Sequence, residues 1–343
     1  MTMRYLIITI LACICVSTAY AQDVAFSQFN EKPLLRNPAL AGVFHGDLRI
    51  SGIFRSQWQS VTVPYRTVGL SGEYKLRANQ HDDWVTLGIQ ALQDVAGDLN
   101  LSRTQILPVI NYHKSLNGNK DDYLSLAFMG GPVNSQFDPS KLRTDEQYGG
   151  GDFDPTLPTG ENFSRTGYSY WDASTGLVFS SSFSEEARFY IGAGIFHFNK
   201  PKLSFYTSNS NVHVDPKYVL NAGVSLPSGE VNRLDIFTDY FVQGGNRQWL
   251  MGFSYLVEFQ RSYELEMTTL GIAFGANYRY KDAFIPVVKL EAYPFSIGIS
   301  YDVNTSPLKT ASNWRGGLEL TATMKAKLTN RSYYQDRVRC ITY

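Results

Sequence analysis

The five histidines are the side chains of this sequence best suited to acid–base or metal chemistry. Their spacing matches no metal-binding motif, and the chain has no G-x-S-x-G elbow, no phosphate-binding loop and no H-E-x-x-H motif. We therefore expect no catalytic residues, no cofactor and no metal. One enzyme class stays open, a barrel hydrolase with a Ser–His pair on its outer wall, which would use His81 or His113. The histidines are His45, His81, His113, His197 and His213.

An acidic pair, Asp152 and Asp154, lies in a segment rich in Gly and Pro, residues 134–167. Two carboxylates fall short of the roughly six to eight oxygen ligands that Ca²⁺ takes, so we interpret the pair as part of a solvated loop. Long loops between strands are typically binding loops or mobile ones. Asp152 and Asp154 are therefore candidate partner-binding residues.

A Gly192-x-Gly194 pair resembles the start of a dinucleotide-binding fingerprint. The third glycine is missing, and the pair falls in the middle of a strand pattern rather than between a strand and a helix. We interpret both glycines as small inward-facing residues of a barrel strand.

Side chains along most of the chain alternate between large apolar and small or polar types. The segment at 271–280 is a clear case, because Ile272, Phe274 and Tyr278 alternate with Gly271, Ala273 and Asn277. Successive side chains of a β-strand point to opposite faces, so such a strand has one apolar face and one cramped or wet face. The pattern is typical of a membrane-spanning β-barrel.

Composition agrees with a barrel and excludes other classes. Of the 343 residues, 18% are charged and 14% are aromatic, and mean hydropathy is −0.21. No apolar run after the N-terminus reaches the length of about 18 residues that a membrane helix needs. The 31 Lys and Arg balance the 31 Asp and Glu, so nothing indicates nucleic-acid binding.

We predict an all-β fold, a transmembrane outer-membrane β-barrel of about 14 antiparallel strands. Aromatic residues near strand ends, such as Trp249, Tyr280 and Trp314, are expected in the interfacial girdle. The long connections 134–167 and 199–216 should lie outside the cell, and the short ones in the periplasm. The predicted strands are 47–57, 65–76, 83–92, 102–114, 122–133, 168–180, 188–198, 217–227, 232–241, 247–259, 269–281, 284–292, 295–303 and 314–326.

Residues 1–21 read as a secretory signal that ends in the small-x-small sequence Ala19–Ala21. A lipoprotein interpretation, with Cys13 acylated, leaves a very short apolar region. Cleavage of the signal leaves Cys340 as the one cysteine, so we expect no internal disulfide.

The remaining chain divides into a periplasmic N-terminal segment (22–46), the barrel (47–327) and a periplasmic tail (328–343). In the first segment, Asn37 and Pro38 are candidate partner-binding residues, and they begin a stretch too short and broken for a strand. We expect it to form either a turn into the first strand or a plug in the lumen. The basic tail is either a solvated end or a contact for a periplasmic partner. Its candidate partner-binding residues are Arg331, Arg337 and Arg339.

Several motifs resemble, in order along the mature chain, those of the PorP/SprF family of type IX secretion system outer-membrane proteins of Bacteroidetes. Arg55-Ser56-Gln57-Trp58 is one, and the tail agrees except that Ile341 stands where the family usually has Pro. The matching stretches are 22–29, 37–42, 55–58, 197–201, 278–283, 300–306, 316–320 and 337–340.

The resemblance implies an integral outer-membrane protein that supports protein secretion and, in gliding species, export of surface adhesins. It implies an accessory component that engages the C-terminal secretion domain of cargo or adhesin, or anchors the periplasmic machinery. The implied partners are other secretion components, periplasmic lipoproteins or peptidoglycan-binding proteins, and membrane lipid. Which cargo is served stays open.

Small inward residues predict a lumen filled by side chains and folded-in loops. The main alternative is a passive channel or transporter barrel for small hydrophobic or sugar substrates, and the barrel hydrolase is the second alternative.

Overall fold

The computed structural model describes residues 23–59, 63–78, 82–117, 121–149, 152–184, 187–203, 205, 212–229, 232–262, 267–307 and 309–328. The signal segment 1–21 and the tail from 329, with Arg331, Arg337, Arg339 and Cys340, lie outside these residues. Among the described residues, no helix is both long and apolar enough to cross a membrane.

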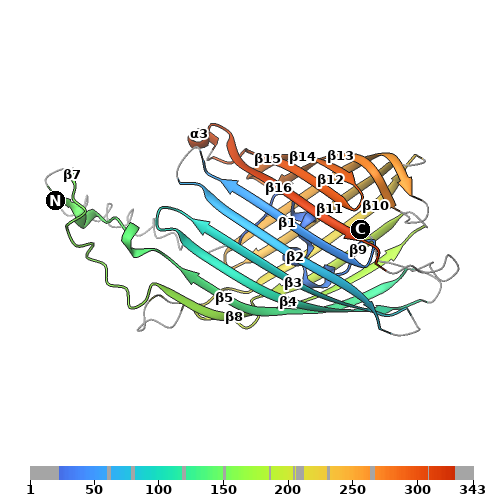
Figure 1. Ribbon diagram of the computed structural model, residues 1–343, viewed down its shortest axis with the longest axis horizontal. Helices are drawn as coiled ribbons and strands as arrows, with labels where there is room; N and C mark the ends of the chain where they lie inside the picture. Colours follow the sequence, from blue (N-terminus) through green and yellow to red (C-terminus); the bar gives the residue numbers. More distant parts are fainter. Residues whose placement is uncertain are drawn as a thin grey trace, which may run out of the picture.

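Fourteen antiparallel strands close into one barrel over the described part of the chain (Figure 1). This confirms the predicted fold class, and every predicted strand overlaps one observed strand. The strands are β1 (Leu48–Gln57), β2 (Tyr65–Arg77), β3 (Trp84–Ala96), β4 (Leu101–Ser115), β5 (Tyr123–Gln136), β8 (Gly167–Ser182), β9 (Arg188–Phe196), β10 (Lys217–Ser228), β11 (Asn232–Gln243), β12 (Asn246–Ser262), β13 (Met267–Arg279), β14 (Ala283–Ala292), β15 (Phe295–Asn304) and β16 (Arg315–Ala326).

The barrel closes between its first and last strands. β1 pairs with β2 on one side and with β16 on the other, from Leu48 opposite Ala326 to Gln57 opposite Gly317. Every other strand pairs with its neighbours in the chain, except that β5 pairs with β8 across a long excursion. Closure leaves no free sheet edge, which a barrel in lipid requires.

The predicted alternation of faces is observed. On β10 and β15, Leu220 and Ile297 point outward and are each 59% exposed, whereas Asn221 and Ser300 point inward and are buried. The outer wall is therefore apolar and the lumen polar, as barrel membrane proteins require.

The two barrel ends differ in their connections. At the long-loop end lie the connections 137–166 and 197–216, and at the short-turn end β1 begins and β16 ends. At the short-turn end, β12 continues to Ser262 and β13 begins at Met267. Exposed aromatics at the long-loop end include the predicted girdle residues Trp249 and Trp314.

The excursion between β5 and β8 projects away from the barrel (Figure 1). It contains η3 (Pro139–Lys141), η4 (Asp145–Gln147) and a hairpin of β6 (Tyr148–Gly149) with β7 (Asp152–Phe153). At its base, Phe137 contacts Phe163 and also Phe205 of the other long connection. The two long connections are thus joined by an aromatic cluster.

The chain before β1 lies inside the barrel. Residues 23–47, which we call the strap, contain η1 (Phe29–Glu31), α2 (Pro33–Arg36) and η2 (Pro38–Leu40) and are mostly buried. The lumen plug was one of the two arrangements that the sequence left open, and the strap adopts it. Residues 23–46 lie within the barrel wall, and their predicted periplasmic location stays a prediction. Lys309–Ser312 forms the short helix α3 at the long-loop end.

Two outward-facing prolines interrupt the pairing of β4 with β5. The ladder stops at Gln105 opposite Val133 and resumes at Val109 opposite Met129, and Pro108 and Pro132 lie in the interval. A proline has no N–H to donate to the ladder. Gly131 compensates by letting the strands approach closely, since a Cβ at this position would collide with the backbone oxygen of Ile106.

We predict that Gly131→Ala destabilises this seam, because the new methyl group forces the two backbones apart. Overpacking of this kind costs about 1–3 kcal/mol. Heat-modifiability of the purified barrel on electrophoresis should show a lower unfolding temperature than the wild type. Gly72→Ala is the matched control, since nothing lies within 4 Å of a Cβ placed there. Equal stability of the two variants would contradict the prediction.

Candidate functional site

The strap and the inward wall residues that hold it form the most elaborate polar arrangement of the described chain. The strap enters at the long-loop end with Asp23 and leaves at the short-turn end, where the backbone N–H of Asp47 donates to the Ala326 carbonyl at 2.9 Å. Four anchors hold the strap between these points, and each pairs a strap group with inward groups of distant strands.

The first anchor fixes Asp23 at the long-loop end. His197, just after β9, contacts Asp23 through Nε2 (2.7 Å) and Asp172 through Nδ1 (2.8 Å). Arg103 donates to Asp23 through Nη1 at 3.2 Å, and the Lys217 ammonium lies 3.8 Å from the same carboxylate. Charged groups from β4 and β10 and the imidazole just after β9 therefore meet the first described residue of the strap.

These charges shift the pKa values of the anchor. Burial disfavours the charged imidazole, but the carboxylates of Asp23 and Asp172 outweigh burial and raise the pKa of His197 to about 9. Burial also opposes ionisation of Asp23, yet His197, Lys217 and Arg103 together lower its pKa well below the usual value. At neutral pH the anchor is an imidazolium between two carboxylates.

The second anchor binds the strap backbone with a wall carboxylate. Glu319 of β16 accepts the backbone N–H groups of Ser27 (2.6 Å) and Gln28 (2.8 Å). Arg55 of β1 holds Glu319 at 3.2 Å and Asp302 at 3.0 Å. All three side chains are buried, so each charge depends on the others for compensation.

The third anchor lies at the middle of the strap. Arg36 makes a bidentate pair with Asp239 (2.7 and 2.8 Å) and donates to the Tyr190 hydroxyl at 2.6 Å. Two parallel N–H···O bonds are the strongest form of such an ion pair.

Asn37 extends this anchor to three strands. Its Oδ1 caps η2 by accepting the Ala39 N–H at 2.9 Å, and Pro38 takes the first helical position, where a missing N–H costs nothing. Its Nδ2 donates to the Ala193 carbonyl and to Asn221 Oδ1, each at 3.1 Å.

Small residues make room for Asn37. A Cβ at Gly176 would overlap Asn37 Oδ1, and one at Gly192 would meet its Nδ2 at 3.0 Å. A Cβ at Gly194 would also contact the side chain. The sequence predicted that Gly192 and Gly194 are small inward-facing residues, and this geometry agrees. The close approach of the strap gives a reason why both are so small.

The fourth anchor lies at the short-turn end. Glu73 of β2 accepts the Gly42 N–H at 2.9 Å and also accepts hydrogen bonds from Nε and Nη2 of Arg49. Asn111 of β4 donates to the carbonyls of Ala39 (2.9 Å) and Ala41 (2.8 Å). Backbone groups of a segment without regular structure are thus satisfied by wall side chains.

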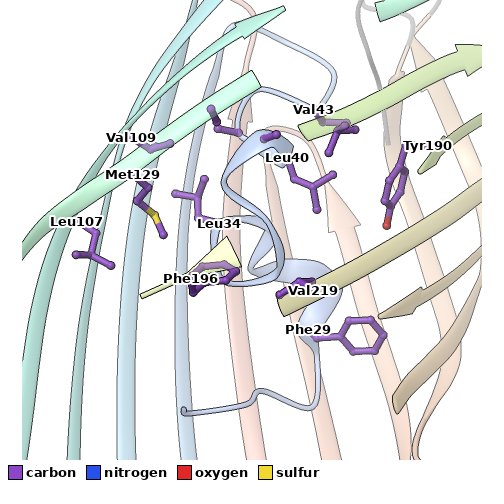
Figure 2. Packing of buried hydrophobic residues seen from close by; sticks show 14 of the residues in the cluster. Phe29, Leu34, Leu40, Val43, Leu107, Val109, Met129, Tyr190, Phe196 and Val219 are labelled. Atoms are coloured by element: carbon purple, nitrogen blue, oxygen red, sulfur yellow. The ribbon is translucent and has the colours of Figure 1, made fainter. Parts of the chain in front are cut away.

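Apolar packing completes the fit. Figure 2 shows Phe29, Leu34, Leu40 and Val43 of the strap among wall residues that include Leu107, Met129, Phe196 and Val219. The Phe29 ring meets that of Phe237 edge-on, with centroids 5.2 Å apart. Beside the strap a cavity of about 70 Å³ remains, which has room for a few water molecules.

The other predicted site residues have local roles. Asp152 lies in β7, and Asp154 Oδ1 accepts the N–H (2.8 Å) and hydroxyl (2.6 Å) of Thr156. These two bonds lower the pKa of Asp154. No group of three or more His, Cys, Asp or Glu that could hold a metal occurs in the described ranges. Arg331, Arg337 and Arg339 lie outside those ranges, so their role stays a prediction.

Sequence reasoning singled out Asn37 and Pro38 as candidate partner-binding residues, which stays a prediction, but it missed Asp23, Arg36, Arg103 and the wall carboxylates as groups that hold the strap. The signal for the wall groups was present, since Asp239, Glu73 and Glu319 are charged residues at inward positions of apolar alternating strands. Such charges need partners. The missing step was to look for those partners in the segment before the first strand.

The family model "Type IX secretion system membrane protein PorP/SprF" matches residues 18–324. No curated protein matches the sequence.

Solved structures with a similar fold include the Ralstonia pickettii toluene transporter TbuX, with 13% identity, 90% of this chain and 94% of that chain covered, and a TM-score of 0.45. A Pseudomonas aeruginosa FadL homologue has 12% identity, coverage of 84% and 92%, and a TM-score of 0.38. At these values nothing follows about what this chain binds.

We predict that Asn37→Ala loosens the strap, because Asn221 Oδ1 and the Ala193 carbonyl lose their donor inside the barrel. The expected cost is about 1–3 kcal/mol. Trypsin should then cut after Arg36, which is buried in the wild type, at least several-fold faster in the folded barrel. The control is Asn30→Ala, since Asn30 donates to the neighbouring Glu31 side chain. Unchanged cleavage of the Asn37 variant would refute its anchoring role.

A second prediction concerns pH. Because the pKa of His197 is raised to about 9 from an unfolded value of 6.5, its stabilisation is full below pH 6.5 and disappears as pH rises through 9. The difference in unfolding temperature between wild type and His197→Gln should therefore shrink as the pH rises from 6.5 to 9. At low pH the difference should correspond to about 3 kcal/mol in the free energy of unfolding. A difference that stays constant from pH 6 to 9.5 would exclude the imidazolium from the anchor.

Proposed function

Because the chain belongs to the PorP/SprF family of type IX secretion system membrane proteins, we propose that it is an accessory component that engages secreted cargo or anchors the periplasmic machinery. The family assignment itself establishes a non-enzymatic barrel of the outer membrane that works with other components of this secretion system. Cargo engagement, anchoring and a contribution to gliding motility are the parts that we propose.

The observation that best supports an accessory role is that the strap fills the lumen. The strap packs against wall residues from β4 to β12, and the cavity beside it measures about 70 Å³. A barrel with its lumen occupied along its length is suited to binding rather than to conduction. This favours an accessory component over a passive channel for small hydrophobic or sugar substrates.

The long-loop end is our candidate for cargo engagement. We place it at the cell surface, because long loops of outer-membrane barrels face outward. The excursion 137–166 projects from the barrel, and its hairpin exposes Tyr148, which is 58% accessible. The aromatic cluster at Phe137 couples it to the second long connection. A C-terminal secretion domain would meet both connections as one surface.

The short-turn end is our candidate for the periplasmic contact. The basic tail with Arg331, Arg337 and Arg339 follows β16 at this end and is suited to an acidic lipoprotein or peptidoglycan-binding partner. We place cargo engagement in the long connections and the periplasmic contact in the tail, so separate variants test the two.

The test is a chromosomal deletion followed by complementation. We expect the deletion strain to lose secretion of proteins with a type IX signal, measured by mass spectrometry of the medium, and the wild-type gene to restore it. A variant with residues 139–164 replaced by a short Gly–Ser linker should reach the outer membrane yet fail to restore secretion. A triple Arg→Gln variant at 331, 337 and 339 tests the tail in the same way.

Outcomes of this test separate the alternatives. Full rescue by both variants would refute both proposed contacts. Loss of nutrient uptake with intact secretion in the deletion strain would favour the passive channel instead.

A further inference from the structure

At the anchor around Asp23, Arg103 has more hydrogen-bond donors than the strap uses. Arg103 reaches Asp23 through Nη1 alone, at 3.2 Å. Its Nε and Nη2 are buried and have no hydrogen-bond partner among the described residues. These two N–H groups form the side of the guanidinium that takes a carboxylate in bidentate fashion. The stronger binding face of Arg103 is thus vacant beside an acid that occupies the weaker one.

A cavity lies beside Arg103. It measures about 30 Å³ and is lined by Arg103, His197 and Lys217 on its polar side and by Leu107 and Met129 on its apolar side. The Asp23 and Arg103 side chains are 16% and 27% exposed, so the pair is partly accessible to solvent.

The charges of the anchor balance only while Asp23 is present. Three cationic groups, Arg103, Lys217 and the His197 imidazolium, face the carboxylates of Asp23, Asp172 and Asp94. Asp172 is held by His197, and Asp94 accepts the Thr67 hydroxyl at 2.6 Å. Removal of the Asp23 carboxylate would leave one positive charge in excess in a largely buried place, which is costly unless another anion replaces it.

We propose that this anchor is a carboxylate-exchange site at the long-loop mouth. An acidic peptide segment of a partner binds the vacant face of Arg103 and takes the place of Asp23 among Arg103, His197 and Lys217. The exchange frees the first residues of the strap, while the anchors at Glu319 and Asp239 still hold the rest. The resident ligand is itself a side-chain carboxylate, so a partner's Asp or Glu side chain is the matching chemistry.

Direct binding to the purified full-length barrel in detergent tests the proposal. The probe is a fluorescent hexaglutamate with an amidated C-terminus, followed by anisotropy. A hexaserine with a free C-terminal carboxylate distinguishes a side-chain carboxylate from a terminal one. We expect salt-sensitive binding of hexaglutamate, about tenfold tighter to Asp23→Asn, because that variant removes the competing carboxylate and keeps the shape of the side chain.

Arg103 variants supply the decisive comparison. Arg103→Gln in the Asp23→Asn background should lose at least tenfold in affinity. Arg103→Lys keeps the charge but removes the bidentate face, so it should lose most of the tenfold increase in affinity for hexaglutamate. This variant replaces Arg103→Gln in the test if Arg103→Gln does not fold. Arg66→Gln is the matched control, since Arg66 of β2 is exposed at the same barrel end. Binding that is unchanged by Arg103→Lys, or weakened equally by Arg66→Gln, would overturn the site.

A second measurement tests whether hexaglutamate releases the first residues of the strap. Saturating hexaglutamate should accelerate thiol labelling of Val24→Cys in a Cys340→Ser background, because Val24 lies beside the cavity. Hexaglutamate that binds without accelerating labelling would overturn the exchange. These assays use purified protein, so their failure would leave the secretion experiment and its conclusion unaffected.

Discussion

The structure depends on one constraint, that charged groups inside the barrel must be paired. Glu319, Asp239 and Glu73 project inward from widely separated strands, and each is buried. A buried carboxylate without a partner costs several kcal/mol, which is a large part of the stability of a typical domain. The strap supplies the cation for Asp239, which is Arg36. It also adds backbone N–H donors to Glu319 and Glu73, which are paired as well with Arg55 and Arg49 of the wall. Wall and strap therefore form one polar network.

The wall of the barrel was largely predictable because its signal is local. A strand with one face in lipid must place an apolar residue at every second position, as Phe295, Ile297 and Ile299 do. That rule acts within each segment and needs no knowledge of distant residues. The observed strands differ from the predicted ones mainly at their ends, where lipid no longer dictates side-chain type.

The strap was less predictable because it has no periodicity and its contacts are distant in sequence. Ser27 meets Glu319 across 292 positions, and Arg36 meets Asp239 across 203. Asn37 and Pro38 were identifiable as a break from strand pattern, but their destination depended on the glycines of β8 and β9. Asp154 shows the opposite case, since its carboxylate is conspicuous in the sequence and accepts two hydrogen bonds from nearby Thr156. The closely spaced aspartates in the sequence indicated a loop. The charged residues that line the lumen are single residues at inward positions of the strands, which are harder to notice.

The strap also dictates how the barrel closes. Asp47 joins the strap to β1, and its backbone and side chain both contact the end of β16, through the Ala326 carbonyl and the Leu328 N–H, each at 2.9 Å. The closing seam between β1 and β16 therefore forms beside the point where the strap leaves the lumen. If closure came first, the strap would have to thread charged residues such as Asp23, Lys32 and Arg36 along a finished lumen. Closure around a strap already in place avoids burying those charges unpaired, because each anchor forms as the wall assembles against it.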